Sequence, residues 1–327
     1  MDVVRIGTLG SARITEASLI GAARQVPEVT VAAVAARDLA RAEAFALRHG
    51  IAAAYGSYDE LLADPDIDAI YNPLPNSLHA QWTRKAIAAG KHVLCEKPFA
   101  SNEAEARLVA DAAAASDLVV MEAMHYRYHP LIQRLTEVVD TLGPVRRIQA
   151  WTSFVIDDPA DIRYDYALGG GALMDGGCYA LDCMRLLGGD LEVSAAVADT
   201  TGEGLVDMSL AARLSFASGA AGWFESAFTR DGEFRADVHV ACENGTAWVR
   251  NFILAHDGEL MVTRAGEDTV TDNSWRSGTE LTTYAWQLHA FAAAITDGAP
   301  VVTSAPEAAT TMRLIDDAYR AAGLPPR

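Results

Sequence analysis

Lysine is scarce in this chain of 327 residues: only three of its 26 basic residues are lysines, and one of them, Lys97, stands between Glu96 and Pro98. Acidic residues number 44, which gives a formal net charge of −18. Nucleic acids and anionic membranes bind basic surfaces, so this balance argues against both as partners. Taken alone, Lys97 would be interpreted as a solvent-facing lysine, so any role for it needs support from other residues.

Cysteine is also scarce. The four cysteines have no C-x-x-C spacing, which predicts buried thiols in a reducing compartment. The histidines are scattered and lack the spacing of metal ligands, so we expect no metal site. No apolar run reaches the roughly 18 residues of a membrane helix. The first residues lack the pattern of a signal peptide, and we therefore expect a soluble, cytoplasmic protein.

Apolar runs alternate with helix-like segments through about the first 120 residues. This alternation is typical of a doubly wound parallel sheet. Between residues 145 and 263 the hydrophobic pattern changes to period two, which predicts a mostly antiparallel sheet. We therefore expect an α/β domain at 1–123 and an α+β domain with a large open sheet at 124–303, with a helix at 304–323 packing back on the first domain.

The stretch "RIGTLGSARIT" follows the first expected strand and opens the first expected helix, where a dinucleotide fold places its pyrophosphate loop. Read as G-x-G-x-x-G/A it gives Gly10, Ala12 and Thr15, a degenerate fingerprint. Without other support, a simple tight turn between strand and helix explains it better. As a cofactor loop, the stretch would contribute Gly7, Gly10, Ala12, Arg13 and Ile14.

The end of the second expected strand bears on the choice of cofactor. An NAD site usually carries Asp or Glu here to bind the ribose hydroxyls. This sequence has Ala36 followed by Arg37. An arginine without a preceding acid suits the 2′-phosphate of NADP, although a solvated surface arginine is an equal alternative. We therefore favour NADP over NAD.

The stretch "YNPLPNSLHAQWTRKAIAAGKHVLCEKPFA" resembles the Gfo/Idh/MocA family of nicotinamide-dependent oxidoreductases, and the resemblance covers essentially the whole chain. It implies an N-terminal Rossmann domain, a C-terminal α+β domain with a large open sheet, and a substrate bound between them. It also implies that Lys97 lies near the nicotinamide, often beside a cis bond to Pro98.

The second catalytic segment of this family usually reads D-x-x-x-H. Here "MDGGCYALD" places Asp175 and then Tyr179, a tyrosine at the histidine position. This resembles the branch that includes glucose–fructose oxidoreductase, dimeric dihydrodiol dehydrogenases and xylose dehydrogenases. The stretch "MHYRYHP", with Arg127 and His129, also resembles that branch.

Three of these residues are candidates for catalysis. Oxidation of an alcohol carbon requires removal of the hydroxyl proton, and the ordinary pKa of tyrosine, about 10, is too high for a base at neutral pH. A neighbouring ammonium favours the phenolate, so Lys97 either lowers the pKa of Tyr179 or binds the reacting oxygen. Asp175, one helical turn earlier, would bind substrate hydroxyls or orient Lys97. The alternatives are an aromatic ring packing under the cleft and a carboxylate on a loop.

Further residues are expected around cofactor and substrate. Glu96 either holds Lys97 or caps the turn. Arg163 would reach the nicotinamide amide or a substrate oxygen, or instead form a salt bridge with Asp161 or Asp165. The remaining candidates are, for the cofactor, Pro73, Leu74, Asn76 (equally a helix N-cap) and His79 and, for the substrate, Arg127.

The leading interpretation is an NADP-dependent oxidoreductase that oxidises a sugar, an aldose at its C1 hydroxyl. A trans-dihydrodiol dehydrogenase or dicarbonyl reductase is the alternative enzyme, favoured if Trp151, Phe154 and Tyr164 line one aromatic pocket. A non-catalytic NADP-sensing regulator is the third reading. The exposed face of the second-domain sheet is expected to be the interface of a homodimer or homotetramer, unless helices of the same chain cover it.

Overall fold

The computed structural model describes residues 3–201, 205–229, 232–276 and 281–327. The chain forms two compact units. Unit 1 comprises Met1–His125 and Tyr284–Ala309, and unit 2 comprises Tyr126–Thr283 and Thr310–Arg327. The sequence placed the whole of 304–323 with the first domain, whereas the structure divides this segment between the units after Ala309.

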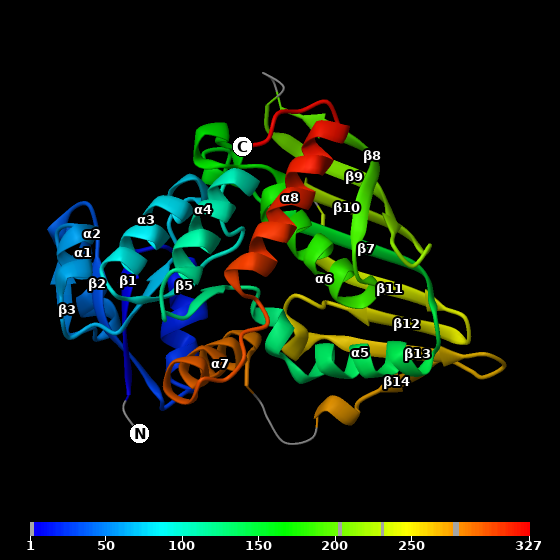
Figure 1. The fold of residues 1–327 in the computed structure, drawn as a ribbon, viewed down its shortest axis with the longest axis horizontal. Coiled ribbons are helices and arrows are strands. Elements are labelled where there is room, and N and C mark those ends of the chain that lie inside the picture. The colour runs from blue at the N-terminus through cyan, green and yellow to red at the C-terminus, as the bar shows by residue number, and fades with distance from the viewer. Residues whose placement is uncertain (1–2, 202–204, 230–231, 277–280) are drawn as a thin grey trace. The chain divides into compact units, whose positions relative to one another are not determined.

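Unit 1 contains a six-stranded parallel sheet in the order β3-β2-β1-β4-β5-β6 (Figure 1). Its strands are β1 Val4–Leu9, β2 Val29–Ala35, β3 Ala53–Tyr55, β4 Ala69–Asn72, β5 His92–Cys95 and β6 Val120–Glu122. The connecting helices are a π-helix at Glu16–Gly21, α1 Leu39–His49, α2 Tyr58–Ala63, α3 Asn76–Ala88 and α4 Glu103–Ala114, and α7 Thr283–Asp297 follows unit 2 in the chain. This strand order is that of a doubly wound dinucleotide-binding sheet, with its switch point between β1 and β4.

Helix α1 shows how local sequence sets these elements. Asp38 precedes it and accepts a hydrogen bond from the backbone nitrogen of Ala40, at 3.0 Å. Gly50 ends it in the left-handed conformation, with φ at 71°. Between them Ala42 and Phe45 are buried, as an amphipathic helix requires.

Unit 2 contains an eight-stranded sheet in the order β14-β13-β12-β11-β7-β10-β9-β8. The strands are β7 Val145–Val155, β8 Leu191–Thr200, β9 Asp207–Phe216, β10 Ala221–Thr229, β11 Arg235–Cys242, β12 Gly245–Arg250, β13 Glu259–Arg264 and β14 Val270–Asp272. The pairing of β7 with β10 is parallel, and the other strand pairs are antiparallel. The expected fold class, a Rossmann sheet plus a large, mostly antiparallel sheet, is confirmed.

The helices of unit 2 cover one face of this sheet. The α-helices are α5 Pro130–Thr141, α6 Cys178–Gly188 and α8 Ala305–Ala321, of which the part from Thr310 belongs to unit 2. A π turn, Leu173–Gly177, leads directly into α6. Short 3-10 helices lie at His125–Tyr128, Ile162–Tyr164, Tyr166–Leu168, Ala255–Asp257 and Ser274–Arg276. Helix α6 and the π turn pack against β7 and β10, and α5 packs against β12 and β13 (Figure 1).

The two faces of the sheet differ in burial. Along β7, Ile148, Ala150 and Thr152 are buried, while the alternating Gln149 and Trp151 are only partly buried. We call the face of Ile148 the inner face and that of Trp151 the outer face. Phe154 has the parity of the inner face, so it lies on the opposite face of the sheet from Trp151. Trp151, Phe154 and Tyr164 therefore do not line one aromatic pocket, the arrangement that would favour a dihydrodiol substrate.

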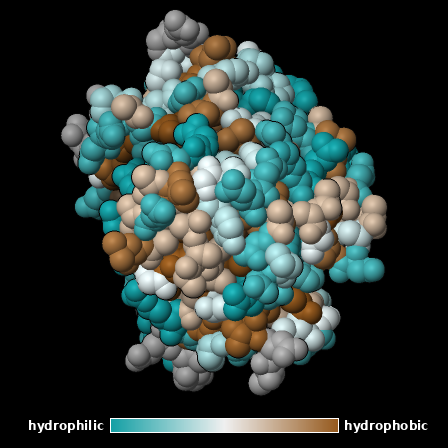
Figure 2. Space-filling model, turned by 90° about the vertical axis from the view of Figure 1, so that its left-hand side faces the viewer, coloured by the Kyte–Doolittle hydropathy of each residue, from teal (hydrophilic) through white to brown (hydrophobic). Residues whose placement is uncertain are grey.

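None of the described helices is long and apolar enough to span a membrane. On the face shown in Figure 2, hydrophobic side chains lie in small patches between hydrophilic ones. Isolated apolar side chains of this kind are normal on a protein surface.

The cap of α5 makes stability depend on pH. The His129 side chain accepts a hydrogen bond from the backbone nitrogen of Leu131 through Nδ1, at 3.2 Å, which requires a neutral ring. Burial, together with the charges of His256 and Arg276, lowers the pKa of His129 to about 4. The unfolded chain therefore binds the extra proton first. The contribution of His129 to the free energy of unfolding is fully present above the unfolded pKa of about 6.5. It is lost as the pH drops below that value.

Because of His129, we expect the free energy of unfolding to be about 2 kcal/mol lower at pH 5 than at pH 7. In His129→Asn, an amide that caps helices but does not titrate, this part of the pH dependence should disappear. Urea unfolding at both pH values measures the difference. His289→Asn, a change at an exposed histidine, is the matched control. An unchanged pH difference in His129→Asn would refute the prediction.

Candidate active site

The first loop of unit 1 has the backbone of a phosphate-binding turn. Gly10 follows β1 with φ at 79°, in the left-handed region, and its nitrogen donates a hydrogen bond to Ala35 O at 2.7 Å. Ala12, Arg13 and Ile14 continue the loop into the first helix, with Arg13 and Ile14 exposed. Gly7 lies inside β1, where an added Cβ would come within 2.9 Å of a Leu61 methyl group, so the position is determined by packing.

Two arginines gather beside this loop. Arg37 follows β2 and is exposed, and Arg41 lies in the first turn of α1. The Arg41 Nε donates to Ser11 Oγ at 2.7 Å, which ties α1 to the loop. Burial raises the pKa of Tyr58, while Arg37 and Arg41 act to lower it, so both guanidinium groups are near its hydroxyl. The sequence analysis missed Arg41, although a second arginine four residues after Arg37 was a usable signal.

The end of β4 contributes a second loop to unit 1. Pro73 and Leu74 are buried there. Pro75 occupies the N-cap position of α3, and Asn76 is the first helical residue, so the alternative of Asn76 as the N-cap is wrong.

His79, in the first turn of α3, joins this loop to the Lys97 segment. Its Nε2 is 2.6 Å from Leu74 O and its Nδ1 is 2.7 Å from Pro98 O. Burial lowers the pKa of His79 to about 4; the two carbonyl oxygens oppose this shift and the charge of Lys97 adds to it. The neutral ring adds no positive charge beside Lys97, and its single N–H donates to one of the two carbonyl oxygens.

Lys97 lies directly after β5, and its peptide bond to Pro98 is cis, as the family resemblance implied. The neighbouring Glu96 is buried and accepts a hydrogen bond from the Tyr71 hydroxyl at 2.6 Å. Ser18 Oγ lies 2.6 Å from that hydroxyl and donates to Ile14 O at 2.7 Å. The Glu96 carboxylate therefore connects the Lys97 segment to β4 and to the first helix.

A buried acid that the sequence analysis missed fixes the other side of this segment. Glu122, at the end of β6, accepts a hydrogen bond from Phe99 N through Oε1 at 3.0 Å. It is 2% exposed. An acidic residue directly after the apolar run "LVVM" was the available signal, because a carboxylate buried at a strand end needs specific donors.

In unit 2, Asp175 lies in the π turn and Tyr179 in the first turn of α6. The turn packs closely on the inner face, since a Cβ at Gly176 would come within 2.7 Å of Phe154 and Ser226. The sequence analysis assumed α-helical spacing between Asp175 and Tyr179. A π turn has i→i+5 hydrogen bonds, so this spacing alone no longer places both side chains on one face.

Arg163 makes a double ion pair. Its Nε donates to Asp175 Oδ2 at 2.7 Å, and its Nη1 lies 3.1 Å from Asp161 Oδ1. The sequence alternative of a salt bridge with Asp161 is therefore present. The charge of Asp175 raises the pKa of Arg163. Arg163 thus fixes the direction of the Asp175 carboxylate.

Beside Tyr179 lies a buried ion pair. The Arg127 Nη1 donates to both carboxylate oxygens of Asp182, at 2.9 and 3.1 Å, and the Tyr126 hydroxyl also donates to Asp182. Burial alone would lower the pKa of Arg127, but the charge of Asp182 reverses this and raises it. The Tyr126 ring meets the Tyr179 ring edge to face, with centroids 6.0 Å apart. Arg127, a predicted substrate ligand, is thus engaged by Asp182, which the sequence analysis missed.

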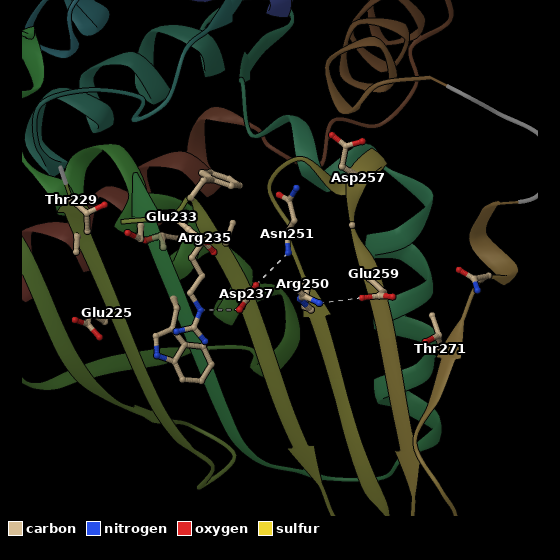
Figure 3. Close-up of a pocket in the computed structure, with 18 of the residues that line it drawn as sticks. Glu225, Thr229, Glu233, Arg235, Asp237, Arg250, Asn251, Asp257, Glu259 and Thr271 are labelled. Atoms are coloured by element: carbon tan, nitrogen blue, oxygen red, sulfur yellow. Dashed lines mark hydrogen bonds and ion pairs between the residues drawn. The ribbon is translucent and has the colours of Figure 1, made fainter. Parts of the chain in front are cut away.

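A polar cavity of about 1050 Å3 opens at the end of the large sheet where β7 and β10 finish (Figure 3). Four of its charged side chains form two ion pairs, Arg235 with Asp237 at 2.8 Å and Arg250 with Glu259 at 3.6 Å. Lys97, Asp175 and Tyr179 are not among its lining residues.

Comparison with known proteins identifies the family. Residues 4–124 match the model of an oxidoreductase family with an NAD-binding Rossmann fold, GFO/IDH/MocA, and residues 132–248 match the C-terminal domain model of the same family. The chain is 39% identical to D-xylose 1-dehydrogenase (NADP(+)) 2 of Haloferax volcanii, over 97% of this chain and 96% of that protein. The chain belongs to the GFO/IDH/MocA oxidoreductase family.

Other family members extend the comparison. Trans-1,2-dihydrobenzene-1,2-diol dehydrogenase of Sus scrofa is 36% identical over 62% of this chain and 61% of its own length. A 3-ketoreductase from Actinomadura kijaniata, solved with NADP and TDP-benzene, has a TM-score of 0.87 at 26% identity and covers 98% of both chains. An aldose-aldose oxidoreductase from Caulobacter crescentus has a TM-score of 0.89 at 25% identity, with the same coverage. The protein is therefore an oxidoreductase with a nicotinamide-dinucleotide Rossmann fold, as expected.

The residues of unit 1 fit such a cofactor. The turn at Gly10 lies at the switch point of the sheet, where dinucleotides bind. The buried hydroxyl of Thr15 finds no hydrogen-bond partner among the described residues. Arg37 and Arg41 supply positive charge after the end of β2, where Ala36 and not an acid stands directly before Arg37. Gly10, Arg37 and Arg41 are the residues we expect to hold the dinucleotide.

Proposed function

We propose that this protein is an NADP-dependent dehydrogenase that oxidises a hydroxyl-bearing carbon of a sugar, an aldose at C1. The observation that carries the proposal is the 39% identity, over nearly the whole chain, with an NADP-dependent D-xylose dehydrogenase. The presence of Lys97, Asp175 and Tyr179 in the motif positions supports it. The cytoplasmic location expected from the sequence stays a prediction.

In this proposal Tyr179 accepts the proton of the substrate hydroxyl as a phenolate. Lys97 lowers the pKa of that phenol or binds the reacting oxygen, because a positive charge favours the anionic form. Asp175, oriented by Arg163, accepts hydrogen bonds from neighbouring substrate hydroxyls. Bound NADP+ would accept the hydride from the carbon that carries this hydroxyl.

Arg37 and Arg41 support NADP over NAD as the cofactor, since a guanidinium group binds a 2′-phosphate through charge-assisted hydrogen bonds. Such a bond contributes about 1.5–3 kcal/mol. We expect Arg37→Ser to raise the KM for NADP+ about 10- to 100-fold and to leave the KM for NAD+ unchanged. Steady-state kinetics with each cofactor measures both values.

Arg84→Ser is the matched control, because Arg84 is exposed on α3 in the same unit. It should change neither KM. Equal changes with both cofactors in Arg37→Ser would show that Arg37 does not read the 2′-phosphate.

The alternative substrate is a trans-dihydrodiol or a dicarbonyl, in line with the relative from Sus scrofa. Phe154 and Tyr164 pack with Ile156, Ala172 and Phe228 directly before the π turn. This cluster is part of the core and lacks Trp151, so the alternative is supported by the relative and not by an aromatic pocket.

We also propose that the outer face of the unit 2 sheet joins copies of this chain into a homodimer or homotetramer. One row of paired residues crosses five strands of this face: Trp223, Gln149, His239, Trp248 and Met261. Trp248 is 38% exposed. Aromatic residues and methionine are enriched at protein interfaces. Sedimentation equilibrium of the wild type and of Trp248→Glu tests the proposal, and a monomeric wild type would end it.

The function is tested by initial rates of NADPH formation at mildly alkaline pH. The panel should contain aldoses, inositols, trans-dihydrodiols and nucleotide-linked sugars, with NAD+ in parallel. Turnover of an aldose with NADP+ supports the proposal, and turnover of dihydrodiols alone supports the alternative. Cofactor binding without turnover on any substrate supports the NADP-sensing regulator.

A further inference from the structure

Arg327, which follows α8, has a side chain that is 1% exposed, although it lies outside every regular element of unit 2. Its Nη2 is 2.5 Å from Asp207 Oδ1, and its Nε donates to Gly170 O at 2.7 Å. The guanidinium also lies over the ring of Tyr319, 4.1 Å from the centroid. A buried arginine with this many specific partners fixes the segments that it joins.

Asp207 is the centre of this cluster, which we call the Asp207 clamp (Asp207, Tyr319 and Arg327). Its carboxylate is fully buried at the start of β9. Oδ1 also accepts a hydrogen bond from the Tyr319 hydroxyl at 2.8 Å, and Oδ2 accepts one from Leu173 N at 2.7 Å. Leu173 is the first residue of the π turn that carries Asp175.

The clamp thus holds both ends of a short segment, Gly170 by its carbonyl and Leu173 by its nitrogen. Of the two residues between them, Gly171 has φ at 133° and leaves no room for a side chain. A Cβ there would come within 2.1 Å of Asp207 Oδ1 and 2.8 Å of the Tyr319 hydroxyl. The Gly171 carbonyl accepts the hydrogen bond of Asp175 N at 3.0 Å. Hydrogen bonds at both ends and the short backbone segment between them thus link Arg327 to Asp175.

We propose that Arg327 is a positioning residue: through Asp207 and Gly170 it fixes the start of the π turn and α6, and so the direction of Asp175 and Tyr179. The consequence for turnover depends on the proposed function of those two residues. A displacement of about 1 Å at a reacting group costs about 100-fold in rate, so even small movement of this turn should be measurable.

The first readout does not need activity. In Arg327→Met we expect faster hydrogen–deuterium exchange in the peptide 169–179, measured by mass spectrometry, with exchange in α5 unchanged. Arg320→Met is the matched control, because Arg320 lies on α8 with half of its side chain exposed and pairs with Asp316 and Asp317. Unchanged exchange in Arg327→Met would overturn the proposal, whether or not the proposed activity exists.

The second readout is kinetic. We expect kcat of Arg327→Met to fall about 10- to 100-fold, with the KM for NADP+ unchanged and the pH profile of kcat shifted, because the surroundings of Tyr179 change. Arg327→Lys, which restores the charge beside Asp207, should recover part of the loss. A variant that only loses folded protein would show a lower rate with an unshifted pH profile, and that result would overturn the proposal.

Arg327→Met leaves a buried carboxylate unpaired, which threatens folding. The double variant Asp207→Asn/Arg327→Met removes both charges and keeps an oxygen for Leu173 N, so it should fold. Because the Gly170 carbonyl is still released, we expect faster exchange at 169–179 and a reduced kcat. Wild-type exchange and kcat in this folded variant would overturn the proposal. If the wild type turns over no substrate, the proposed function is wrong. The hydrogen–deuterium exchange of the variants then still tests the role of the Asp207 clamp.

Discussion

Tyr179→Phe should lower kcat by about 100- to 10,000-fold, the range that a positioned general acid or base contributes. The ring keeps its edge-to-face packing with Tyr126, so the loss isolates the hydroxyl. Because the phenolate must form before the hydride leaves, the limb of the pH profile that belongs to Tyr179 should also disappear. Initial rates across a pH series, with the aldose that gives the highest wild-type rate, measure both effects.

The matched control is Tyr55→Phe, whose hydroxyl donates to Asp64 at 2.6 Å in unit 1. It removes the same atom from a tyrosine without a proposed role, and kcat should stay at the wild-type value. A Tyr179→Phe enzyme that keeps kcat within a few-fold of wild type would exclude Tyr179 as the base and leave Lys97 as the candidate proton acceptor.

Asp182→Ala should lower the free energy of unfolding by about 3–5 kcal/mol, because removal of one partner leaves Arg127 buried without its counter-charge. The Arg127 and Asp182 side chains are 12% and 5% exposed. The Tyr126 hydroxyl loses its acceptor in the same change. Urea denaturation followed by circular dichroism gives the difference.

An exposed ion pair provides the comparison. Arg313 and Asp317 lie one turn apart on α8 at 3.1 Å, and each side chain is about one-third exposed. Asp317→Ala should cost less than about 1 kcal/mol. Equal effects of the two substitutions would mean that the Arg127–Asp182 pair is not the stabilising element that its burial indicates.

The sequence was sufficient for the architecture of both sheets, because each leaves a distinct hydrophobic period. Continuous apolar runs such as that at β2 are buried on both sides, and the alternation along β7 marks a sheet with one covered face. Capping residues mark element ends as well: Gly50, in the left-handed conformation, closes α1 directly after His49.

Partners distant in the sequence were outside the reach of these patterns. The ion-pair partner of Arg127, Asp182, lies 55 residues later and could not be read from the sequence around Arg127, whose role as a substrate ligand stays a prediction. The π turn at Asp175 depends on close packing of Gly176 against Phe154 and Ser226, which helical periodicity does not encode. The roles of Lys97, Asp175 and Tyr179 rest on the family motif and stay predictions until the variants are measured.

The discontinuity of unit 1 has a consequence for synthesis of the chain. Its edge strand β6 forms a bridge between Met121 and Ser304, and Glu122 N donates to Thr303 O at 2.9 Å. These partners are translated after the whole first stretch of unit 2. A nascent chain that has already assembled β1 to β6 therefore exposes an unpaired edge until residue 304 leaves the ribosome, so the cofactor-binding sheet is among the last parts of the protein to be completed.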